Sequence, residues 1–368
     1  MELTAEHLAA ELISLGRSVG LDAVGMADAR PFPEVRAELE RRRAAGLSGG
    51  MQFTYRNPER STDPRHILDG ARSLVVAARR TPAPRLADVG AGRMRIAAYA
   101  RHDHYADLRR GLSRLAGHLQ TGGWATRVVA DDNALVDRAA AVRAGIGWWG
   151  RNANVLLPGR GSWFVLGTVV TNAPLPVSEP IDDGCGTCRR CLDGCPTGAI
   201  VEPGVVDARR CLAWLVQAPG SIPREFRAAL GGRLYGCDDC QEVCPVGRPD
   251  RMADGTDDPA ADVEAVWVLR AKDDDLMDRF GRWYIADRDP TYLRRNALVA
   301  LGNTAAGDDP TVTGLLEVYL ASDNSILRSH AVWAAGRLGR LDLLDGLEAG
   351  SDLLVVEELA AVRDRVGT

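Results

Sequence analysis

Cysteine is missing from most of this chain, which has none before residue 185 and none after residue 244. Long apolar runs are missing as well, since no run approaches the roughly 20 residues that a membrane-spanning helix needs. The first residues are acidic and contain neither the basic segment nor the apolar segment of a secretory signal. We therefore expect a cytoplasmic protein with no signal peptide and no membrane association.

Lysine is nearly absent, with Lys272 as its only example, so basic charge comes almost entirely from arginine. The chain has 45 basic and 50 acidic side chains and a net charge of −5. This balance does not indicate nucleic-acid binding, although a local arginine-rich face can still bind phosphate. The apolar fraction of 46% is ordinary for a soluble protein, and 368 residues are enough for two or three domains.

The cysteines that are present follow an ordered spacing. The first run reads C-x2-C-x2-C-x3-C-P, the second reads C-x2-C-x3-C-P, and one cysteine lies between them. The full set is Cys185, Cys188, Cys191, Cys195, Cys211, Cys237, Cys240 and Cys244. Two 4Fe–4S clusters need eight thiolates, and the first run is the one that bacterial ferredoxins use. We therefore predict two clusters and a protein that transfers electrons.

The spacing also suggests how the ligands are shared. In two-cluster ferredoxins the cysteine before the proline of the first run ligates the other cluster. The predicted ligands of cluster one are Cys185, Cys188, Cys191 and Cys244. The predicted ligands of cluster two are Cys195, Cys237, Cys240 and, as the only thiol left, Cys211. Paired structural zinc sites are the alternative, but the crowded third cysteine and the prolines do not suit zinc. Disulfides are disfavoured because this pattern, without an export signal, indicates a reducing compartment.

The rest of the chain divides into three regions. Helical and strand-like segments alternate over the first ~175 residues, which is typical of an α/β or α+β domain. Apolar periodicity predicts helices at residues 5–21, 105–120 and 135–144, and strands at residues 73–78, 127–130 and 162–171. A proline-rich connection and a later polar linker give the predicted domains 1–178, 179–252 and 253–368.

The third region contains an internal repeat. Residues 293–303 align with residues 327–337, with Leu, Arg, two Ala and Gly in matching positions. Small residues on a helix that ends in glycine suit the close stacking of helix pairs in HEAT-like solenoids. An ordinary helical bundle with a chance similarity is the alternative.

Gly145, Gly147 and Gly150 match the dinucleotide pattern G-x-G-x-x-G. A true fingerprint needs a strand before it and a helix after it. Here a helix is predicted before the glycines and a strand after them, so we reject NAD binding. Close packing of a loop near a large flat ligand is a better use for these residues.

Taken together, these blocks resemble the epoxyqueuosine reductases. The resemblance rests on the cysteine module, on the GIGWWGRN block at residues 145–152, on GSWFVLG at residues 161–167 and on LRRNALVALGN at residues 293–303. It covers about residues 51–339. It implies a multidomain α+β protein, with an N-terminal α/β cobalamin-binding domain, a two-cluster ferredoxin-like module and C-terminal α-helical HEAT-like repeats. The family is related to the reductive dehalogenases.

The resemblance also implies a reaction, the reductive removal of the epoxide oxygen of epoxyqueuosine at wobble position 34 of tRNA. The reaction takes two electrons and two protons and leaves an alkene and water. Electrons would reach cobalamin through the two 4Fe–4S clusters. No D-x-H-x-x-G motif is present, so a base-off cobalamin without a protein histidine on cobalt is expected.

For the site, the resemblance implies that Asp131 protonates the departing oxygen. A helix cap formed by Asp131 or Asp132 is the alternative. The residues carried over to the cobalamin and its pocket are Arg56, Asp103, Asp131, Arg151 and Ser162.

Two segments depart from the family's usual pattern. Residues 102–105 read HDHY where RDYH is common, and residues 212–217 read LAWLVQ where ISYLTIE is common. The second change leaves open a related corrinoid and iron–sulfur reductase that acts on a small molecule or another modified nucleoside. A dedicated electron carrier is a third possibility, but it would not need the N-terminal domain.

The expected partners are tRNA and a low-potential electron donor, and we expect a monomer. Arg294, Arg295 and Arg328 on the repeats are the candidate phosphate contacts, because guanidinium groups donate paired hydrogen bonds to phosphate.

Overall fold

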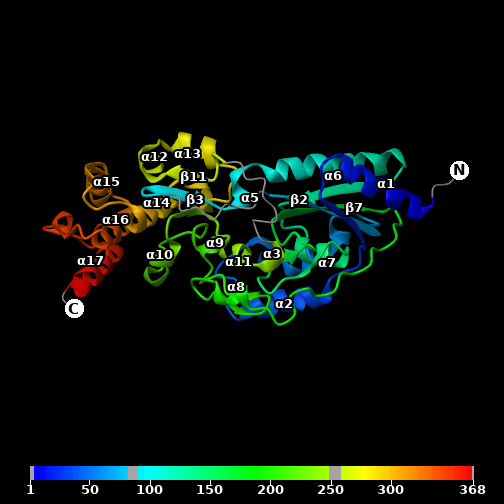
Figure 1. The fold of residues 1–368 in the computed structure, drawn as a ribbon, viewed down its shortest axis with the longest axis horizontal. Helices are drawn as coiled ribbons and strands as arrows, with labels where there is room; N and C mark the ends of the chain where they lie inside the picture. The colour runs from blue at the N-terminus through cyan, green and yellow to red at the C-terminus, as the bar shows by residue number, and fades with distance from the viewer. Residues whose placement is uncertain (1–3, 82–89, 248–257, 367–368) are drawn as a thin grey trace. The chain divides into compact units, whose positions relative to one another are not determined.

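Figure 1 shows the computed structural model, which describes residues 4–81, 90–247 and 258–366. The chain forms two compact units, each made of three separate segments. The sheet unit comprises Met1–Arg85, His102–Arg209 and Asp238–Gly255. The helical unit comprises Leu86–Arg101, Arg210–Cys237 and Thr256–Thr368. Across the described ranges, no helix is long and apolar enough to cross a membrane.

A four-stranded antiparallel sheet with the strand order β1-β2-β7-β4 forms the centre of the sheet unit. Its strands are β1 (Ala23–Asp28), β2 (Ser73–Arg80), β7 (Phe164–Thr171) and β4 (Thr126–Ala130). The first six residues of β2 are all buried, so both faces of the sheet are covered. This explains why β2 reads as a continuous apolar run instead of an alternating pattern.

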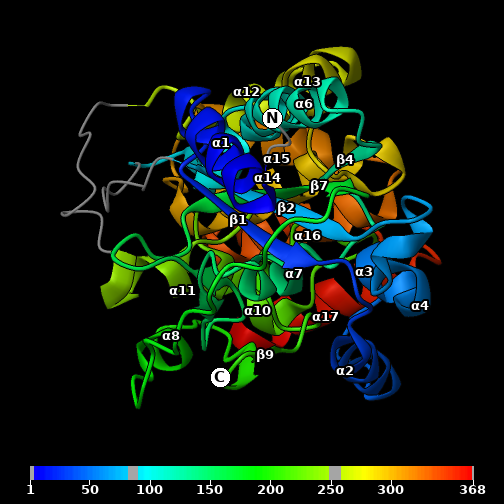
Figure 2. The same ribbon diagram turned by 90° about the vertical axis from the view of Figure 1, so that its right-hand side faces the viewer.

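Helices cover the two faces of this sheet. Helices α1 (Ala5–Ser18) and α6 (His104–Thr121) lie on one face, and α7 (Asp137–Arg143) lies on the other, as Figures 1 and 2 both show. The leucines of α6 repeat every three or four residues and are buried against the sheet. Close approach is possible because β7 has Gly167 below the helix, where a Cβ atom would lie 2.7 Å from Leu112 Cδ1.

The remaining elements of the sheet unit are short, apart from α2. They are α2 (Pro33–Ala44), α3 (Phe53–Arg56), α4 (Pro58–Ser61), η1 (Pro64–His66), β5 (Trp148–Trp149), β6 (Val155–Leu156), α8 (Arg190–Asp193), β8 (Ile200–Glu202), β9 (Val205–Val206), α11 (Asp239–Glu242) and η2 (Pro245–Gly247). The cysteines of this unit therefore lie on loops and single helical turns.

A small three-stranded sheet, ordered β10-β3-β11, and a set of helices form the helical unit. The strands are β10 (Arg233–Tyr235), β3 (Arg93–Ile96) and β11 (Asp262–Glu264), and β3 runs parallel to β10 and antiparallel to β11. The helices are α5 (Ala98–Arg101), α9 (Leu212–Leu215), α10 (Arg224–Leu230), α12 (Ala265–Arg270), α13 (Asp273–Phe280), η4 (Ala286–Arg288), α14 (Thr291–Thr304), α15 (Pro310–Leu320), α16 (Ser325–Arg337), η5 (Leu341–Leu344) and α17 (Leu353–Val366).

The two repeated segments form equivalent helices, α14 and α16. A Cβ atom at Gly302 of α14 would lie 2.9 Å from the Cα atom of Ala334 on α16. A Cβ atom at Gly336 of α16 would lie 2.6 Å from Val362 Cγ1 on α17. Each glycine of the repeat therefore lets its helix pack closely against the next.

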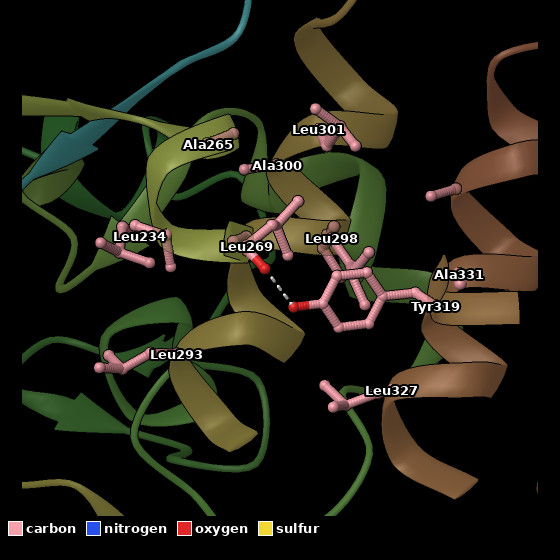
Figure 3. Packing of buried hydrophobic residues seen from close by; sticks show 14 of the residues in the cluster. Leu234, Ala265, Leu269, Leu293, Leu298, Ala300, Leu301, Tyr319, Leu327 and Ala331 are labelled. Carbon is pink, nitrogen blue, oxygen red and sulfur yellow. Dashed lines mark hydrogen bonds between the residues drawn. The ribbon is translucent and has the colours of Figure 1, made fainter. Parts of the chain in front are cut away.

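Figure 3 shows the core around α14, where leucines and alanines from several helices surround one buried phenol. The hydroxyl of Tyr319 on α15 donates a hydrogen bond of 2.7 Å to the carbonyl of Leu269 on α12. Hydrogen bonding thus satisfies the polar end of an otherwise apolar side chain.

Candidate functional site

Asp131 is the first residue after strand β4, and its backbone φ is +55°. This is the left-handed region, which residues with a Cβ atom rarely adopt, although aspartate tolerates it better than most. Such strain persists where the surroundings fix it, and it is often found at active sites. The residue predicted to be the acid is therefore held at a strained point of the backbone.

The carboxyl group of Asp131 has a pKa above its usual value. Partial loss of water around the carboxyl is the main cause, although the residue as a whole is exposed. Asp132 and Asp103 raise this pKa further, whereas Arg109 lowers it. An acid whose pKa moves toward neutrality keeps its proton available for donation.

Neither Asp131 nor Asp132 caps the helix that follows. Helix α7 begins at Asp137, its N-cap residue is Val136, and no side chain accepts a capping hydrogen bond there. Asp132 instead accepts a hydrogen bond of 2.9 Å from the backbone N–H of Ala134 and closes a turn. The capping alternative is therefore wrong for both aspartates.

Two groups outside the predicted site residues, Tyr105 on α6 and Asp137 on α7, share the electrostatic environment of Asp131. Burial raises the pKa of Tyr105 well above its usual value, and the charges of Asp131 and Asp137 add to this shift. Burial raises the pKa of Asp137 to about 8, with contributions from Asp131 and Asp132 and an opposing one from Arg138. Both groups are therefore mainly neutral at pH 7.

The carboxyl of Asp137 is unusual for the start of a helix. Partial positive charge at this end of α7 favours a carboxylate, but the cost of burial outweighs it. Its Oδ1 atom is buried and has no hydrogen-bond partner. In the sequence, Asp137 is an acidic residue directly after two apolar ones, and this pattern does not reveal that its carboxyl is buried.

The other predicted site residues lie at separate places in the sheet unit. Asp103 caps α6 by accepting a 2.9 Å hydrogen bond from the N–H of Ala106, and it is close enough to raise the pKa of Asp131. Ser162 donates a 3.0 Å hydrogen bond to Oε1 of Gln241 on α11. Arg56 is exposed and Arg151 is half-buried. Within the described ranges, no hydrogen bond or ion pair links Arg56, Arg151 or Ser162 to Asp131.

The glycine block is preceded by helix α7, contains strand β5 between Gly147 and Gly150 and is followed by strand β6, whereas a dinucleotide site has a strand before its glycines and a helix after them. A Cβ atom at Gly145 would lie 2.1 Å from the carbonyl oxygen of Glu179, and one at Gly147 would lie 2.2 Å from that of Leu156. These glycines allow protein backbones to approach each other.

Four of the cysteines in the sheet unit form one electrostatic group. Burial raises the pKa of Cys191 to about 11, and Cys244, Cys185 and Cys188 raise it further. Burial likewise raises the pKa of Cys244, with contributions from Cys185 and Cys188. These four thiols are the set that the spacing predicts for cluster one.

Two sulfur atoms of the first run accept hydrogen bonds from N–H groups. The indole N–H of buried Trp148 donates to Sγ of Cys185 at 3.4 Å, and the N–H of Ala199 donates to Sγ of Cys195 at 3.2 Å. None of the eight cysteines, all of which lie within the described ranges, is part of a disulfide bond. Thiolates that accept N–H bonds in a partly apolar pocket are the donor set of an iron–sulfur cluster.

Cys211 and Cys237 belong to the helical unit, whereas Cys195 and Cys240 belong to the sheet unit. The carbonyl of Cys211 accepts hydrogen bonds of 2.9 Å from the N–H groups of Trp214 and Leu215 at the start of α9. Cys237 packs against the apolar core of the helical unit.

The altered segment at residues 212–217 forms α9 and the turn after it. Leu212, Leu215 and Val216 are buried in the core of the helical unit, and Trp214 is buried with its ring stacked against Tyr284. Apolar residues at these positions are therefore explained by core packing. The interpretation that they change a substrate pocket has no support from their burial.

The prediction that Arg295 contacts tRNA phosphate is wrong, because this side chain is fully buried. Its guanidinium donates to the carbonyl oxygens of Ala218 and Leu215 at 2.7 and 3.0 Å, and burial lowers its pKa to about 9. Arg294 is paired with Asp273 at 2.6 Å. Arg328 donates to the carbonyl of Leu320 at 2.9 Å. All three side chains thus make bonds within the protein.

Comparison with known proteins places this arrangement in a family. A model described as a 4Fe-4S double cluster binding domain matches residues 184–247, which contain all eight cysteines. Epoxyqueuosine reductase of Bacillus anthracis is 32% identical over 348 residues, covering 91% of this chain and 90% of that protein. The chain belongs to the epoxyqueuosine reductase family.

Solved epoxyqueuosine reductases have the same fold along almost the whole chain. One, crystallised with an epoxyqueuosine-modified stem loop of tRNA-Tyr, has a TM-score of 0.85 and 30% identity and covers 98% of this chain and 100% of that one. Another, from Bacillus subtilis with its catalytic aspartate loop swung out of the active site, has a TM-score of 0.86 and 29% identity and covers 98% and 99%. The epoxyqueuosine reductase fold thus accounts for both units.

Proposed function

We propose that this chain reduces epoxyqueuosine to queuosine at wobble position 34 of tRNA. The observation that carries the proposal is its match, over 98% of its length, to an epoxyqueuosine reductase crystallised with an epoxyqueuosine-modified stem loop. Eight cysteines outside any disulfide bond and an aspartate with a raised pKa supply the chemical groups that such a reduction needs. The partner is therefore the anticodon stem loop of a tRNA that carries the epoxide.

In this proposal the eight cysteines hold two 4Fe–4S clusters that pass electrons one at a time from an external low-potential donor. Cluster one is ligated by Cys185, Cys188, Cys191 and Cys244. Cluster two is ligated by Cys195, Cys211, Cys237 and Cys240. The mutual influence of the first four thiols and the N–H bonds to sulfur support the assignment.

The second cofactor in the proposal is a base-off cobalamin bound by the sheet unit. Near Arg151, the buried side chain of Asn152 has an Nδ2 atom without a hydrogen-bond partner in the part of the chain that the structure describes. A buried donor of this kind fits a ligand rich in amide oxygens. Arg56, Asp103, Asp131, Arg151 and Ser162 remain the proposed surroundings of the cofactor. When bound, cobalamin supplies the reduced metal centre that opens the epoxide.

Asp131 would protonate the oxygen as it leaves carbon, because an unprotonated alkoxide is a poor leaving group. Its raised pKa supports this role, and the strained backbone fixes the position of its Cα atom.

The proposed domains are residues 1–178, 179–252 and 253–368. The helices from α14 to α17 would form the HEAT-like arm of the third domain. The sequence argument for a reductase of small molecules is weakened, because Leu212, Leu215 and Val216 pack in a core.

The test is anaerobic incubation of the loaded protein with reductant and epoxyqueuosine-containing tRNA, followed by mass spectrometry of the nucleosides. We expect queuosine to appear. The same tRNA without the epoxide is the control. Failure to form queuosine with iron and corrinoid both bound would overturn the proposal.

Asp131→Asn should bind iron and corrinoid as the wild type does. It should form queuosine at least about 100-fold more slowly, since general acids contribute roughly 10²–10⁴-fold to the rate. The rate of queuosine formation measures this, with cofactor content as the control. A variant with the wild-type rate would remove Asp131 from the mechanism.

A further inference from the structure

Trp148 on β5 has a buried indole N–H with one hydrogen-bond acceptor. The residue is 7% exposed, and its Nε1 atom donates to Sγ of Cys185 at 3.4 Å. In the part of the chain that the structure describes, this N–H has no other acceptor. A thiol sulfur accepts hydrogen bonds only weakly, whereas a thiolate is charged and accepts them strongly. The bond is therefore best explained if Cys185 is a thiolate, which is the form that binds a metal.

The packing around the ring fixes the direction of this N–H. Trp148 pairs with Leu156 on β6, and both belong to an apolar cluster that includes Cys244 and has Cys185 packed against it. A Cβ atom at Gly184 would lie 2.6 Å from Cζ2 of the indole, so the glycine before Cys185 lets the ring lie directly on the backbone. The indole is thus held by residues of both cysteine runs.

We propose that Trp148 is a positioning residue that raises the reduction potential of cluster one through its N–H bond to Cys185. The inference rests on the proposed function, in which Cys185 is a ligand of this cluster. When the external electron donor gives cluster one an electron, no bond breaks and no proton is needed, and the ligand sulfurs become more negative. The N–H group therefore stabilises the reduced form more than the oxidised form.

The other cluster has hydrogen-bond donors that do not depend on Trp148. The N–H of Ala199 donates to Sγ of Cys195 at 3.2 Å, and the hydroxyl of Thr197 lies 3.7 Å from the same sulfur. In the proposed assignment Cys195 ligates cluster two. Loss of the indole N–H should therefore change the potential of cluster one and leave that of cluster two as it is.

The test is a redox titration of the anaerobic holoprotein, in which electron paramagnetic resonance follows the reduced clusters. Trp148→Phe keeps an aromatic ring but lacks the N–H. At a fixed potential, its ratio of reduced to oxidised cluster one should be about threefold to tenfold lower than in the wild type, since hydrogen bonds to charged groups are the stronger ones. A tenfold change corresponds to about 59 mV for a one-electron couple.

Trp149→Phe is the matched control. Trp149 is the next residue, it is exposed, and within the described ranges it donates no hydrogen bond to a cysteine sulfur. Both cluster potentials of this variant should equal those of the wild type.

A second variant separates the hydrogen bond from the packing of the ring, because phenylalanine is smaller than tryptophan and could admit water beside Cys185. Benzothienylalanine at position 148 has a ring with the shape of an indole and a sulfur atom in place of the N–H. It should keep the full iron content and show the same fall in the potential of cluster one as Trp148→Phe.

Wild-type potentials in both variants, or equal shifts of the two clusters, would overturn the inference and leave Trp148 as a packing residue. A wild type that holds both clusters but forms no queuosine would count against the proposed function alone. A wild type that binds no cluster would overturn both.

Discussion

At the scale of single residues, the site depends on how burial and charge set the pKa of a few acids. Asp131 and Asp137 are six positions apart in the chain and differ in backbone geometry, exposure and hydrogen bonding. The sequence predicts Asp131 only through resemblance to a family, and it does not predict Asp137. Burial of Asp137 depends on the packing of α7 against β1, β2 and β7, which no local pattern records.

The raised pKa of Asp137 makes the stability of the protein depend on pH. A carboxyl in the unfolded chain loses its proton near pH 3.9, whereas in the folded protein Asp137 keeps it to about pH 8. Between these values the unfolded state binds fewer protons, so the free energy of unfolding falls as the pH rises, by up to about 1.4 kcal/mol per pH unit. Above about pH 8 this dependence ends.

Asp137→Asn should therefore be more stable than the wild type at pH 8, with little difference near pH 4. Urea unfolding of both proteins between pH 5 and pH 9 measures the two slopes. Asp69→Asn, an exposed change in the same unit, should retain the wild-type slope. Equal slopes in wild type and Asp137→Asn would show that the carboxyl is ionised in the folded protein.

At the scale of helices and strands, periodicity predicted the longer elements of the sheet unit, apart from β1 and α2. Helices α1, α6 and α7 and strands β2, β4 and β7 match the expected segments, because apolar spacing follows the faces that the sheet buries. Helix α2 was not predicted, and it has no buried residue, so it lacks the pattern on which such predictions rest. Strand β1 was missed as well.

The repeated glycines make a prediction about helix packing. Gly302→Ala should lower the free energy of unfolding, because its Cβ atom would meet the backbone of Ala334, and overpacking of a core typically costs about 1–3 kcal/mol. Gly314→Ala on α15 is the matched control, since nothing lies within 4 Å of its Cβ position. That change should raise stability by up to about 1 kcal/mol. Denaturant unfolding measures both, and equal effects would contradict the close packing of α14 on α16.

At the scale of the whole chain, the two compact units of the structure do not coincide with the three domains predicted from the sequence. Leu86–Arg101 and Arg210–Cys237 belong to the helical unit, although segments of the sheet unit surround them in the sequence. Strand β3 joins that unit by pairing with β10 and β11, which follow it at a long distance in the chain. Pairings between strands that are distant in the chain leave no local pattern in the sequence. Composition could therefore indicate the linkers, but it could not indicate which segments form each compact unit.

The cysteines, in contrast, could be assigned from sequence, because cluster chemistry fixes their number and spacing. Cys191→Ala should lose cluster one, so iron should fall from about eight to about four atoms per chain. Asp193→Ala, an exposed change in the same loop, should keep the full content. Iron and acid-labile sulfide analysis measures both. Full iron in Cys191→Ala would exclude this cysteine as a ligand.

The indole of Trp148 gives the protein an optical reporter of its own assembly. Its N–H group donates directly to the sulfur of Cys185, and the ring lies beside Cys244 in the same apolar cluster. An iron cluster on these sulfurs would absorb the energy of the excited ring and dim its fluorescence. Cluster insertion and oxidative loss could therefore be followed in real time as a change in light emission, with no added dye.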